Sequence, residues 1–268
     1  MEKVISRIAC LLLVVFLATP ACAQLLMEKS RVEETVKPGD TIVDTITLHN
    51  NGKQPMDLTI YWEDFEYLPP FDGKKKFMPA GSGSYSMANW IAFSPKEVTI
   101  LPHNKKDINF AIKVPSSATG GHYGVMFFES GSRQRADTTG VSIVTRMGAL
   151  FFIESTVKDK TAQIKNMDFS GNQLQGVFVN KGNIILFPQG IYYIMDKEGL
   201  VTKRGELNKI YLPPGNEAPF AIDLSHDLKE GEYTLVLTFD LAQGDSVVKE
   251  IDLKKNSDAT YQILQQRD

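Results

Sequence analysis

Apolar and polar residues alternate along much of this chain. Residues 44–48, 57–62 and 107–114 each alternate with a period of two. This period places one face of a strand in a core and the other face in water. Clusters rich in Gly, Pro, Asn or Asp separate such stretches, at 38–40, 50–52, 181–183 and 213–216. Many short strands divided by turns are typical of β-sandwiches, so we expect an all-β fold.

The two halves of the sequence repeat one series of elements. Thirteen residues separate Phe110 from Tyr123, and thirteen separate Phe220 from Tyr233. Each half also carries an Asn-x-Gly turn and a Leu-Pro pair, which begin at Asn50, Leu101, Asn180 and Leu212. We therefore expect two tandem immunoglobulin-like sandwiches. Each Gly-x-Tyr is interpreted as a tyrosine corner, in which the hydroxyl bonds to nearby backbone.

The repeat predicts how the chain is divided. The expected parts are a signal peptide at 1–23, a first domain at 24–157, a second domain at 158–255 and a polar tail at 256–268. The charged connector after residue 156 is short, which favours a fixed angle between the domains. Residues 66–89 have no counterpart in the second half and include three consecutive lysines. A connection this long either carries function or is a tolerated surface insertion.

The first residues predict export. Two basic residues, Lys3 and Arg7, precede a short apolar run at 11–17. A small-residue cleavage pattern then ends at Ala23. The run is too short to cross a bilayer, and no later stretch approaches the ~20 apolar residues that a membrane helix needs. We therefore predict a periplasmic protein with no transmembrane segment after cleavage. Processing as a lipoprotein at Cys22 is the less favoured alternative.

The cysteine content and the net charge bear on how the protein is stabilised and on which class of partner it binds. Both cysteines precede residue 24, so the exported chain has no thiol, and its stability must come from core burial. Removal of residues 1–23 takes away two basic and one acidic side chain, which changes the formal net charge from −3 to −4. This mild negative charge argues against a nucleic-acid partner.

Motifs for catalysis or for metal binding were not found in the sequence. The four histidines are scattered, and no Gly-x-Ser-x-Gly elbow or thiol nucleophile is present after the signal peptide. The Gly-rich loops lack the spacing and the following helix that phosphate binding requires. We therefore predict a protein that is not an enzyme and that has neither a cofactor nor a metal site.

The longest apolar strand of the first half spans residues 139–153. One of its faces carries four candidate partner-binding residues: Val141, Ile143, Thr145 and Met147. An apolar strand at a sheet edge can pair with a second chain, whose backbone supplies affinity while alternate side chains supply specificity. The alternative is a central strand that the rest of the protein covers on both sides.

Residues 25–157 resemble the first domain of periplasmic pilus-assembly chaperones. The resemblance rests on Ser30-Arg31-Val32 and the Asn-rich turn that follows at 50–51, on the Leu-Pro turn at 101–102, and on the long strand at 142–152. It implies two immunoglobulin-like domains set as a boomerang. It also implies capture of a partner subunit along the last strand of the first domain.

The same resemblance implies two basic residues that hold the partner's terminal carboxylate through charge-assisted hydrogen bonds. The first corresponds to Arg31. The second falls on Gly148 or Ala149, so Arg146 is the nearest basic substitute. Arg31 and Arg146 therefore complete the candidate partner-binding site.

Residues 115–129 are closer to a second group, the WxL-interacting proteins of Gram-positive cell surfaces, which also have two similar sandwich domains. That group implies binding to peptidoglycan or to another envelope protein. We expect an exported, chaperone-like protein that captures a secreted or surface protein subunit by β-strand addition. The alternative is a structural or adhesive envelope module that binds peptidoglycan.

Overall fold

The structure is a computed structural model that describes residues 24–131, 144–224 and 228–268. These residues form strands, turns and loops. No helix within those ranges is long and apolar enough to span a membrane. The predicted signal peptide and Cys22 lie outside the described residues.

The strands fall into two consecutive groups. The first group consists of β1 (Leu25–Met27), β2 (Arg31–Val36), β3 (Thr41–Asn50), β4 (Met56–Tyr67), β5 (Lys75–Pro79), β6 (Ile91–Ser94), β7 (Glu97–Ile100), β8 (Asn104–Lys113), β9 (Gly121–Ser130) and β10 (Thr145–Ser155). The second group consists of β11 (Ala162–Ser170), β12 (Gln173–Asn180), β13 (Gln189–Met195), β14 (Val201–Glu206), β15 (Glu217–Asp223), β16 (Gly231–Asp240), β17 (Ser246–Lys255) and β18 (Tyr261–Arg267).

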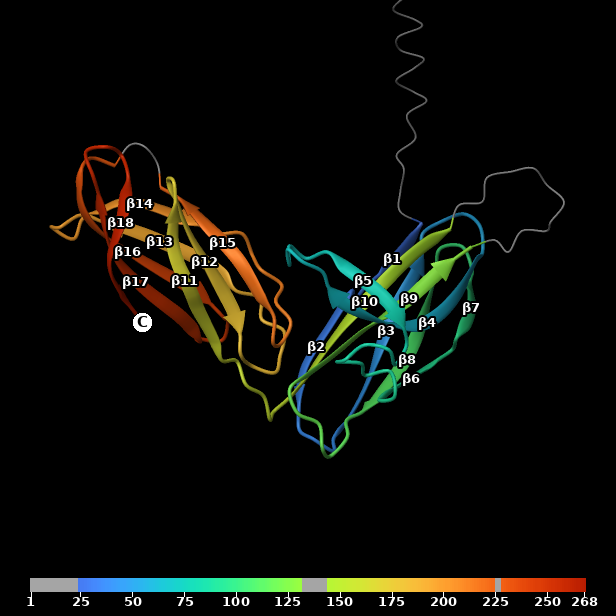
Figure 1. The fold of residues 1–268 in the computed structure, drawn as a ribbon. Coiled ribbons are helices and arrows are strands. Elements are labelled where there is room, and N and C mark those ends of the chain that lie inside the picture. The colour runs from blue at the N-terminus through green and yellow to red at the C-terminus, as the bar shows by residue number, and fades with distance from the viewer. Residues whose placement is uncertain (1–23, 132–143, 225–227) are drawn as a thin grey trace, which may run out of the picture.

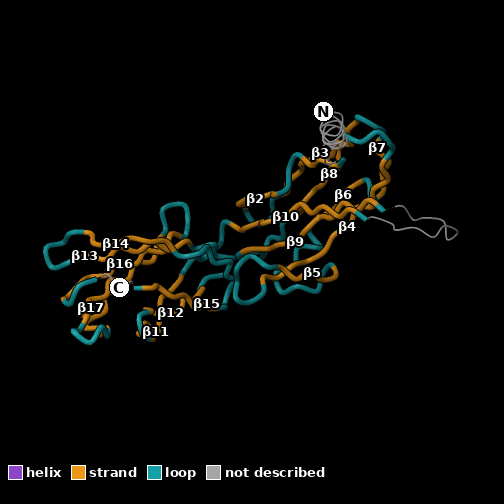
Figure 2. Tube along the Cα trace, turned by 90° about the horizontal axis from the view of Figure 1, so that it is seen from above, coloured by secondary structure: helices purple, strands orange, loops and turns teal. Residues whose placement is uncertain are grey.

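Each group forms two facing sheets. In the first group one sheet has the order β1-β3-β8-β6, and the other has the order β2-β10-β9-β4-β5 with β7 also paired to β4. In the second group the orders are β11-β12-β15 and β14-β13-β16-β17-β18. The two groups make two lobes that meet in a V, and from above they lie end to end (Figures 1 and 2). The prediction of an all-β fold with two tandem immunoglobulin-like sandwiches is confirmed.

The period-two patterning explains the first core. On β3 the alternate residues Ile46 and Leu48 are fully buried, and on β8 so are Ile108 and Ile112. They pack against inward-facing residues of the other sheet, among them Phe128 of β9. Hydrophobic burial along one face of each strand therefore holds the first sandwich together.

The second core is continuous with the outer face of the first domain. It gathers the inward residues of β12, β13, β16 and β17, among them Phe178 and Phe239. The same cluster includes Tyr67, Tyr123 and Phe152, which lie on the side of the six-stranded sheet that faces away from the first core. The six-stranded sheet is therefore apolar on both faces, and the second lobe covers part of the outer one.

The repeat has a structural counterpart in two buried asparagines. The side-chain amide of Asn50 donates to the carbonyls of Gln54 and Ile100, at 2.8 and 2.9 Å. The amide of Asn180 donates to Ile184 and Leu212 at the same two distances. Ile100 thus corresponds to Leu212, whereas the sequence repeat pairs Leu101 with Leu212. The sequence alignment is wrong by one residue here, because hydrogen bonding and not the Leu-Pro pair sets the register.

The tyrosine-corner interpretation holds for one copy only. The hydroxyl of Tyr233 donates to the carbonyl of Lys229, four residues upstream, at 2.9 Å. The hydroxyl of Tyr123 instead accepts the backbone N–H of Ile185, in the second lobe, at 2.7 Å. The interpretation is therefore wrong for Tyr123, which joins the two lobes.

The segment expected as a polar tail, 256–268, is part of the second sandwich. Its residues Tyr261–Arg267 form β18, which pairs antiparallel with β17. Tyr261 is buried, and Arg267 binds the carboxylate of Asp252 on β17. The sequence of β18 is polar because an edge strand buries few of its side chains.

Candidate functional site

Strand β10 has a partly open edge. It pairs antiparallel with β9 over Thr145–Glu154, but it pairs with β2, in parallel, only over Leu150–Ser155. The chain before β2 leaves this sheet, since β1 pairs with β3 in the opposite sheet. No described residue therefore pairs with the β2 side of Thr145–Ala149. β10 is central along its second half and an edge along its first.

The two faces of β10 have different surroundings. Ala149, Phe151 and Ile153 are buried in the core of the first sandwich, and Met147 packs against that core. Leu150 and Phe152 point to the other side, toward the second lobe. Thr145 is exposed at the start of the strand. Of the four predicted pocket residues, Met147 thus faces the core, while Val141 and Ile143 lie outside the described residues.

Arg31 lies at the start of β2, next to Leu150 of β10. Its guanidinium lies over the ring of Phe152, 4.1 Å from the centroid, and 5.3 Å from the ring centroid of Phe187 in the second lobe. It also pairs with the carboxylate of Glu33. The side chain is 39% exposed. Arg31 therefore stands between the two lobes with part of its surface open to solvent.

Arg146 occupies a different part of the same face. Its guanidinium binds the carboxylate of Glu63 at 2.6 Å and lies 3.4 Å from the ring centroid of Phe127. It stands four residues before Leu150 on β10, which is about 13 Å along a strand. The structure therefore does not bring Arg146 to Arg31, and it gives Arg146 partners of its own.

The two other positions for a second basic residue are closed to one. A Cβ atom on Gly148 would stand 2.8 Å from a methyl carbon of Val125 and 2.9 Å from the ring of Phe127.

 Ala149 itself is 0% exposed and points into the first core, where a charged side chain would be strongly destabilising. Neither position could therefore hold the second cation that the family resemblance implies.

Two lysines that the sequence analysis did not single out lie near aromatic rings in the same region as Arg31. Lys75 of β5 places its Nζ 4.8 Å from the ring centroid of Tyr67, and its neighbour across the hairpin is also Tyr67. Lys209 places its Nζ 5.5 Å from the ring centroid of Phe187 and 5.8 Å from that of Tyr211. The run of three lysines within 66–89 was the available signal for Lys75. Nothing in the sequence pattern singled out Lys209.

The electrostatics of this region reflect burial and like charge. Burial lowers the pKa of Lys75, and the positive charge of Arg31 lowers it further. Burial also raises the pKa of the Tyr67 hydroxyl well above its ordinary value, while the charge of Arg31 acts in the opposite direction. The charge of Arg31 thus acts on the pKa of both Lys75 and Tyr67, which places the three side chains in one electrostatic environment.

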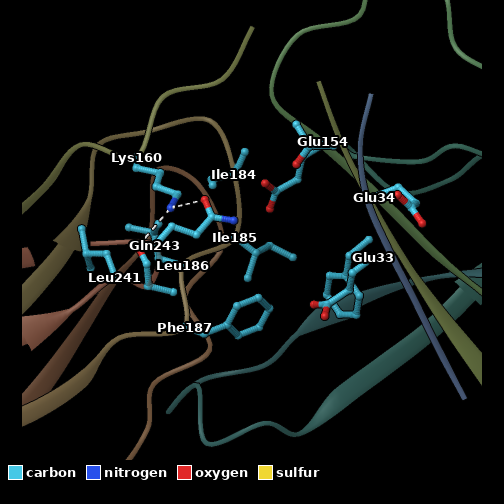
Figure 3. Close-up of a pocket in the computed structure, with 13 residues that line it drawn as sticks. Glu33, Glu34, Glu154, Lys160, Ile184, Ile185, Leu186, Phe187, Leu241 and Gln243 are labelled. Carbon is cyan, nitrogen blue, oxygen red and sulfur yellow. Dashed lines mark hydrogen bonds between the residues drawn. The ribbon is translucent and has the colours of Figure 1, made fainter. Parts of the chain in front are cut away.

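A cavity of about 300 Å³ lies between the lobes, and its lining includes Phe152, the ring over which Arg31 lies. Phe187 and Ile185 face it from the second lobe, and Glu33 and Glu154 face it from the first (Figure 3). On the far wall Lys160 donates to the side chain of Gln243 at 2.9 Å. The cavity therefore has an apolar centre with carboxylates on the side of the first lobe.

Segment 66–89 helps to form this region. Its residues 75–79 are β5, and the β4–β5 hairpin lies on the side of the first lobe that faces the second (Figure 1). Phe71 is 6% exposed, and its carbonyl accepts the N–H of Tyr211 in the second lobe at 2.9 Å. The segment thus contributes to the contact between the lobes, which distinguishes it from a surface insertion.

The described residues offer no metal centre. Within 24–131, 144–224 and 228–268, no group of three or more His, Cys, Asp or Glu side chains could hold a metal ion. His122 packs against the ring of Trp90 with centroids 4.0 Å apart, and His49 pairs with Glu28 at 2.6 Å. Each of these two histidines thus has a local structural partner.

Comparison with known proteins identifies the fold. No protein-family model matches the sequence, and no curated protein matches it either. Two solved structures are similar: the chaperone from a chaperone–tip adhesin complex of CFA/I fimbriae, and the class 5 fimbriae chaperone CfaA. They are 14% and 13% identical to this chain, each match covers 84% of this chain and 97% of the other, and both TM-scores are 0.52. The chain therefore has the fold of the fimbrial chaperones, with two tandem immunoglobulin-like sandwiches.

Proposed function

We propose that this chain is an exported, chaperone-like binding protein that captures a secreted or surface protein subunit by β-strand addition. It acts in the periplasm after cleavage of the signal peptide, and it is not an enzyme. The observation that carries the proposal is the open edge of β10 at Thr145–Ala149. One of the two similar chaperones was solved in a complex with a tip adhesin, which supports the same kind of partner here.

The open edge presents backbone groups in the direction a partner strand needs. The N–H of Leu150 donates to the carbonyl of Ser30, at the point where pairing with β2 begins. Because successive N–H groups alternate in direction along a strand, the N–H groups of Gly148 and Arg146 point to the same side. Those two groups and the carbonyls between them can pair with an added strand.

Charge favours one direction for that strand. β2 runs parallel to β10 and begins at Arg31. A strand added in parallel before β2 would end beside Arg31, so its terminal carboxylate would meet a positive charge. A strand added antiparallel would bring a positive terminal amine to the same place. We therefore infer parallel addition, with the partner's carboxyl terminus toward Arg31.

A pair of variants at one position tests strand addition. Arg146→Ala and Arg146→Pro both remove the guanidinium, but only the proline also removes the backbone N–H on the open side. We expect Arg146→Pro to capture an envelope partner about tenfold less well than Arg146→Ala, since a ladder hydrogen bond is lost and the ring blocks the edge. The measurement is co-purification from periplasm with quantitative mass spectrometry.

The two variants also serve as controls for each other. Circular dichroism should show the same folded β spectrum for both, because proline is tolerated at an unpaired edge. If both variants capture the same partners in the same amounts, or if the wild-type protein captures none, β-strand addition at β10 is refuted.

A further inference from the structure

Strands β4 and β9 separate where they approach the second lobe. They pair only as far as Glu63 and Val125. Beyond that point the N–H of Tyr123 on β9 donates to the carbonyl of Tyr85, at 2.8 Å, so β9 contacts the segment before β6 in place of β4. Residues 64–67 of β4 therefore have β5 on one side and, among the residues that the structure describes, no backbone partner on the other.

The direction of the unpaired groups follows from the pairing of β4 with β5. The N–H of Leu68 donates to the carbonyl of Lys74, which lies on the β5 side. Because successive residues of a strand alternate in direction, the N–H and C=O groups of Phe65 and Tyr67 point to the opposite side. We call these four backbone groups the β4 edge. They match the donors and acceptors of an extended peptide.

A cavity of about 240 Å³ lies beside residues 64–67 of β4. Segment 83–86 forms a second wall, and the second lobe contributes a third, made of Ile185, Pro213, Pro214 and Asn216. The volume is below the ~300–1,000 Å³ of pockets that hold drug-sized ligands. The cavity is therefore suited to a small group or to the end of a chain.

A buried carboxylate lines this cavity. Asp64 is 1% exposed, and its oxygens accept hydrogen bonds from Trp62, Gly83 and Ser86. No lysine, arginine or histidine in the described part of the chain forms an ion pair with it. Burial of a charge is costly unless an opposite charge accompanies it, so the cavity beside Asp64 favours a cation.

Aromatic rings and a free hydroxyl hydrogen complete the walls. The ring of Tyr123 is 6.3 Å from that of Tyr85 and 6.5 Å from that of Phe65, between centroids. Such rings attract an ammonium group. Tyr123 is 2% exposed, and its hydroxyl oxygen accepts the N–H of Ile185, but no described residue accepts the hydroxyl hydrogen. This hydrogen can be donated to a carbonyl of a ligand.

We propose that this cavity binds the free amino terminus of a partner chain in an extended conformation. The α-ammonium group lies toward Asp64, and the first peptide groups pair with the β4 edge. An α-amino group is largely protonated at pH 7, and every protein whose signal peptide has been removed presents one. The inference rests on the proposed function for the class of partner, a secreted or surface protein, but its site is on β4 and not on β10.

The test uses three small probes that differ in one feature each. Alanylalanine amide has an ammonium group and peptide groups, its N-acetyl derivative has peptide groups alone, and ethanolamine has an ammonium group alone. Each is titrated into the full exported chain, and the amide shifts of Phe65 and Tyr67 are followed by NMR. We expect saturable shifts for alanylalanine amide and binding at least about tenfold weaker for each of the other two probes.

Three substitutions assign the contacts. Asp64→Asn removes the buried charge at nearly constant size and should weaken the binding of alanylalanine amide about tenfold. Ser84→Trp fills the cavity from an exposed position and should abolish binding while the charge of Asp64 remains. Glu66→Gln is the matched control, because Glu66 lines the same cavity but is exposed and pairs with Lys76. It should change the affinity by less than about twofold.

The outcomes separate this inference from the proposed function. Equal binding of the free and acetylated dipeptides, absence of saturable shifts, or insensitivity to Ser84→Trp would each overturn it. Equal binding of ethanolamine would assign the cavity to amines in general, lipid headgroups included, and would also overturn it. If Asp64→Asn fails to fold, the probes and Ser84→Trp still decide. The Arg146 variants test strand addition at β10 independently, so either idea can fail while the other stands.

Discussion

At the scale of single residues, Asn50 and Asn180 show how one side chain can hold a turn. Both are 0% exposed. In each, the amide donates to two carbonyls while the side-chain oxygen accepts a backbone N–H, from Gly52 or Gly182, at 2.9 Å. The sequence made the two asparagines comparable because each begins an Asn-x-Gly turn. It could not show that they are buried, since turn asparagines are more often exposed.

Substitution of either asparagine should be costly. Asn50→Ala leaves two carbonyls and the N–H of Gly52 without their partner, so we expect a loss of about 3 kcal/mol in the free energy of unfolding. Urea denaturation followed by tryptophan fluorescence measures it for the first sandwich, because both tryptophans, Trp62 and Trp90, lie there. Asn180→Ala should lower the stability of the second sandwich, which circular dichroism reports.

The control for this prediction is the adjacent residue. Asn51 is exposed, and its side chain takes no part in the turn. Asn51→Ala should therefore change the free energy of unfolding by less than about 0.5 kcal/mol. Equal effects of Asn50→Ala and Asn51→Ala would show that the buried amide contributes little.

His122 should make stability depend on pH. Burial lowers its pKa below the ordinary 6.5, although backbone contacts at Ser86 and Thr119 act in the opposite direction. The unfolded chain then binds a proton more readily than the folded one, so this contribution to stability is present above pH 6.5 and is lost as the pH falls. Urea midpoints measured on both sides of that pH should fall on acidification, and His122→Gln should show a smaller fall. An unchanged slope in the variant would contradict the assignment.

At the scale of strands, alternation was a sufficient signal for most of the fold. The stretches 44–48, 57–62 and 107–114 lie in or overlap β3, β4 and β8. The final strand, β18, was not predicted from the sequence. It is an edge strand with few apolar residues, so its sequence shows no strong alternation. The extent of the open edge of β10 was not predicted for another reason. This edge depends on where β2 begins and on the position of β1 in the opposite sheet. Local sequence patterns do not reveal such long-range strand pairing.

The candidate site was predictable only in part. Arg31 was found because it stands in the opening strand that carries the family resemblance. The second cation was sought on β10, where Gly148 and Ala149 leave no room for one. Lys75 and Lys209 reach the same place through tertiary packing of a hairpin and a loop. Residues brought together by three separate segments share no spacing that a single sequence could reveal.

The segment that follows β5 offers a prediction about one buried carboxylate. Asp64 is 1% exposed and accepts from the N–H of Gly83 at 2.9 Å, the hydroxyl of Ser86 at 2.8 Å and the indole N–H of Trp62 at 3.3 Å. It thus attaches residues 83–86 to β4. Asp64→Ala should cost about 3 kcal/mol and should speed hydrogen exchange at Gly83, because three donors lose their acceptor.

An exposed carboxylate on the same strand provides the comparison. Glu66 pairs with Lys76 at 3.4 Å in a solvent-exposed contact. Glu66→Ala should change the free energy of unfolding by less than about 0.5 kcal/mol and leave exchange at Gly83 unaltered. If Asp64→Ala behaves like Glu66→Ala, the segment is held by its other contacts, such as the buried Met87.

At the scale of the whole molecule, close backbone contacts join the two lobes. The N–H of Gly121 donates to the carbonyl of Asn183 at 3.0 Å, and a Cβ on Gly120 would stand only 2.4 Å from the same oxygen. The N–H of Asn183 in turn donates to the carbonyl of Asp159 in the connector at 3.0 Å. These contacts join the two lobes and the connector, and glycine at 120 is needed for the close approach.

Tyr123 tests whether this junction matters for both stability and recognition. The residue is 2% exposed, and its hydroxyl accepts the N–H of Ile185 across the junction at 2.7 Å. Tyr123→Phe leaves that N–H without a partner, so we expect a loss of about 1–2 kcal/mol in the free energy of unfolding. Tyr233→Phe should cost less, since the hydroxyl of Tyr233 is exposed and bonds within its own lobe.

The same variant should also weaken ligand binding at a distance. The ring of Tyr123 packs against Phe152, with centroids 5.5 Å apart, and Phe152 lies under Arg31. Because Arg31 lies over Phe152 of the first lobe and near Phe187 of the second, a looser junction spreads these groups over more positions and raises the cost of bringing them together. Tyr123→Phe should therefore capture an envelope partner less well than Tyr233→Phe in co-purification from periplasm. Equal capture by the two variants would show that the lobes hold these groups in place without the help of this hydrogen bond.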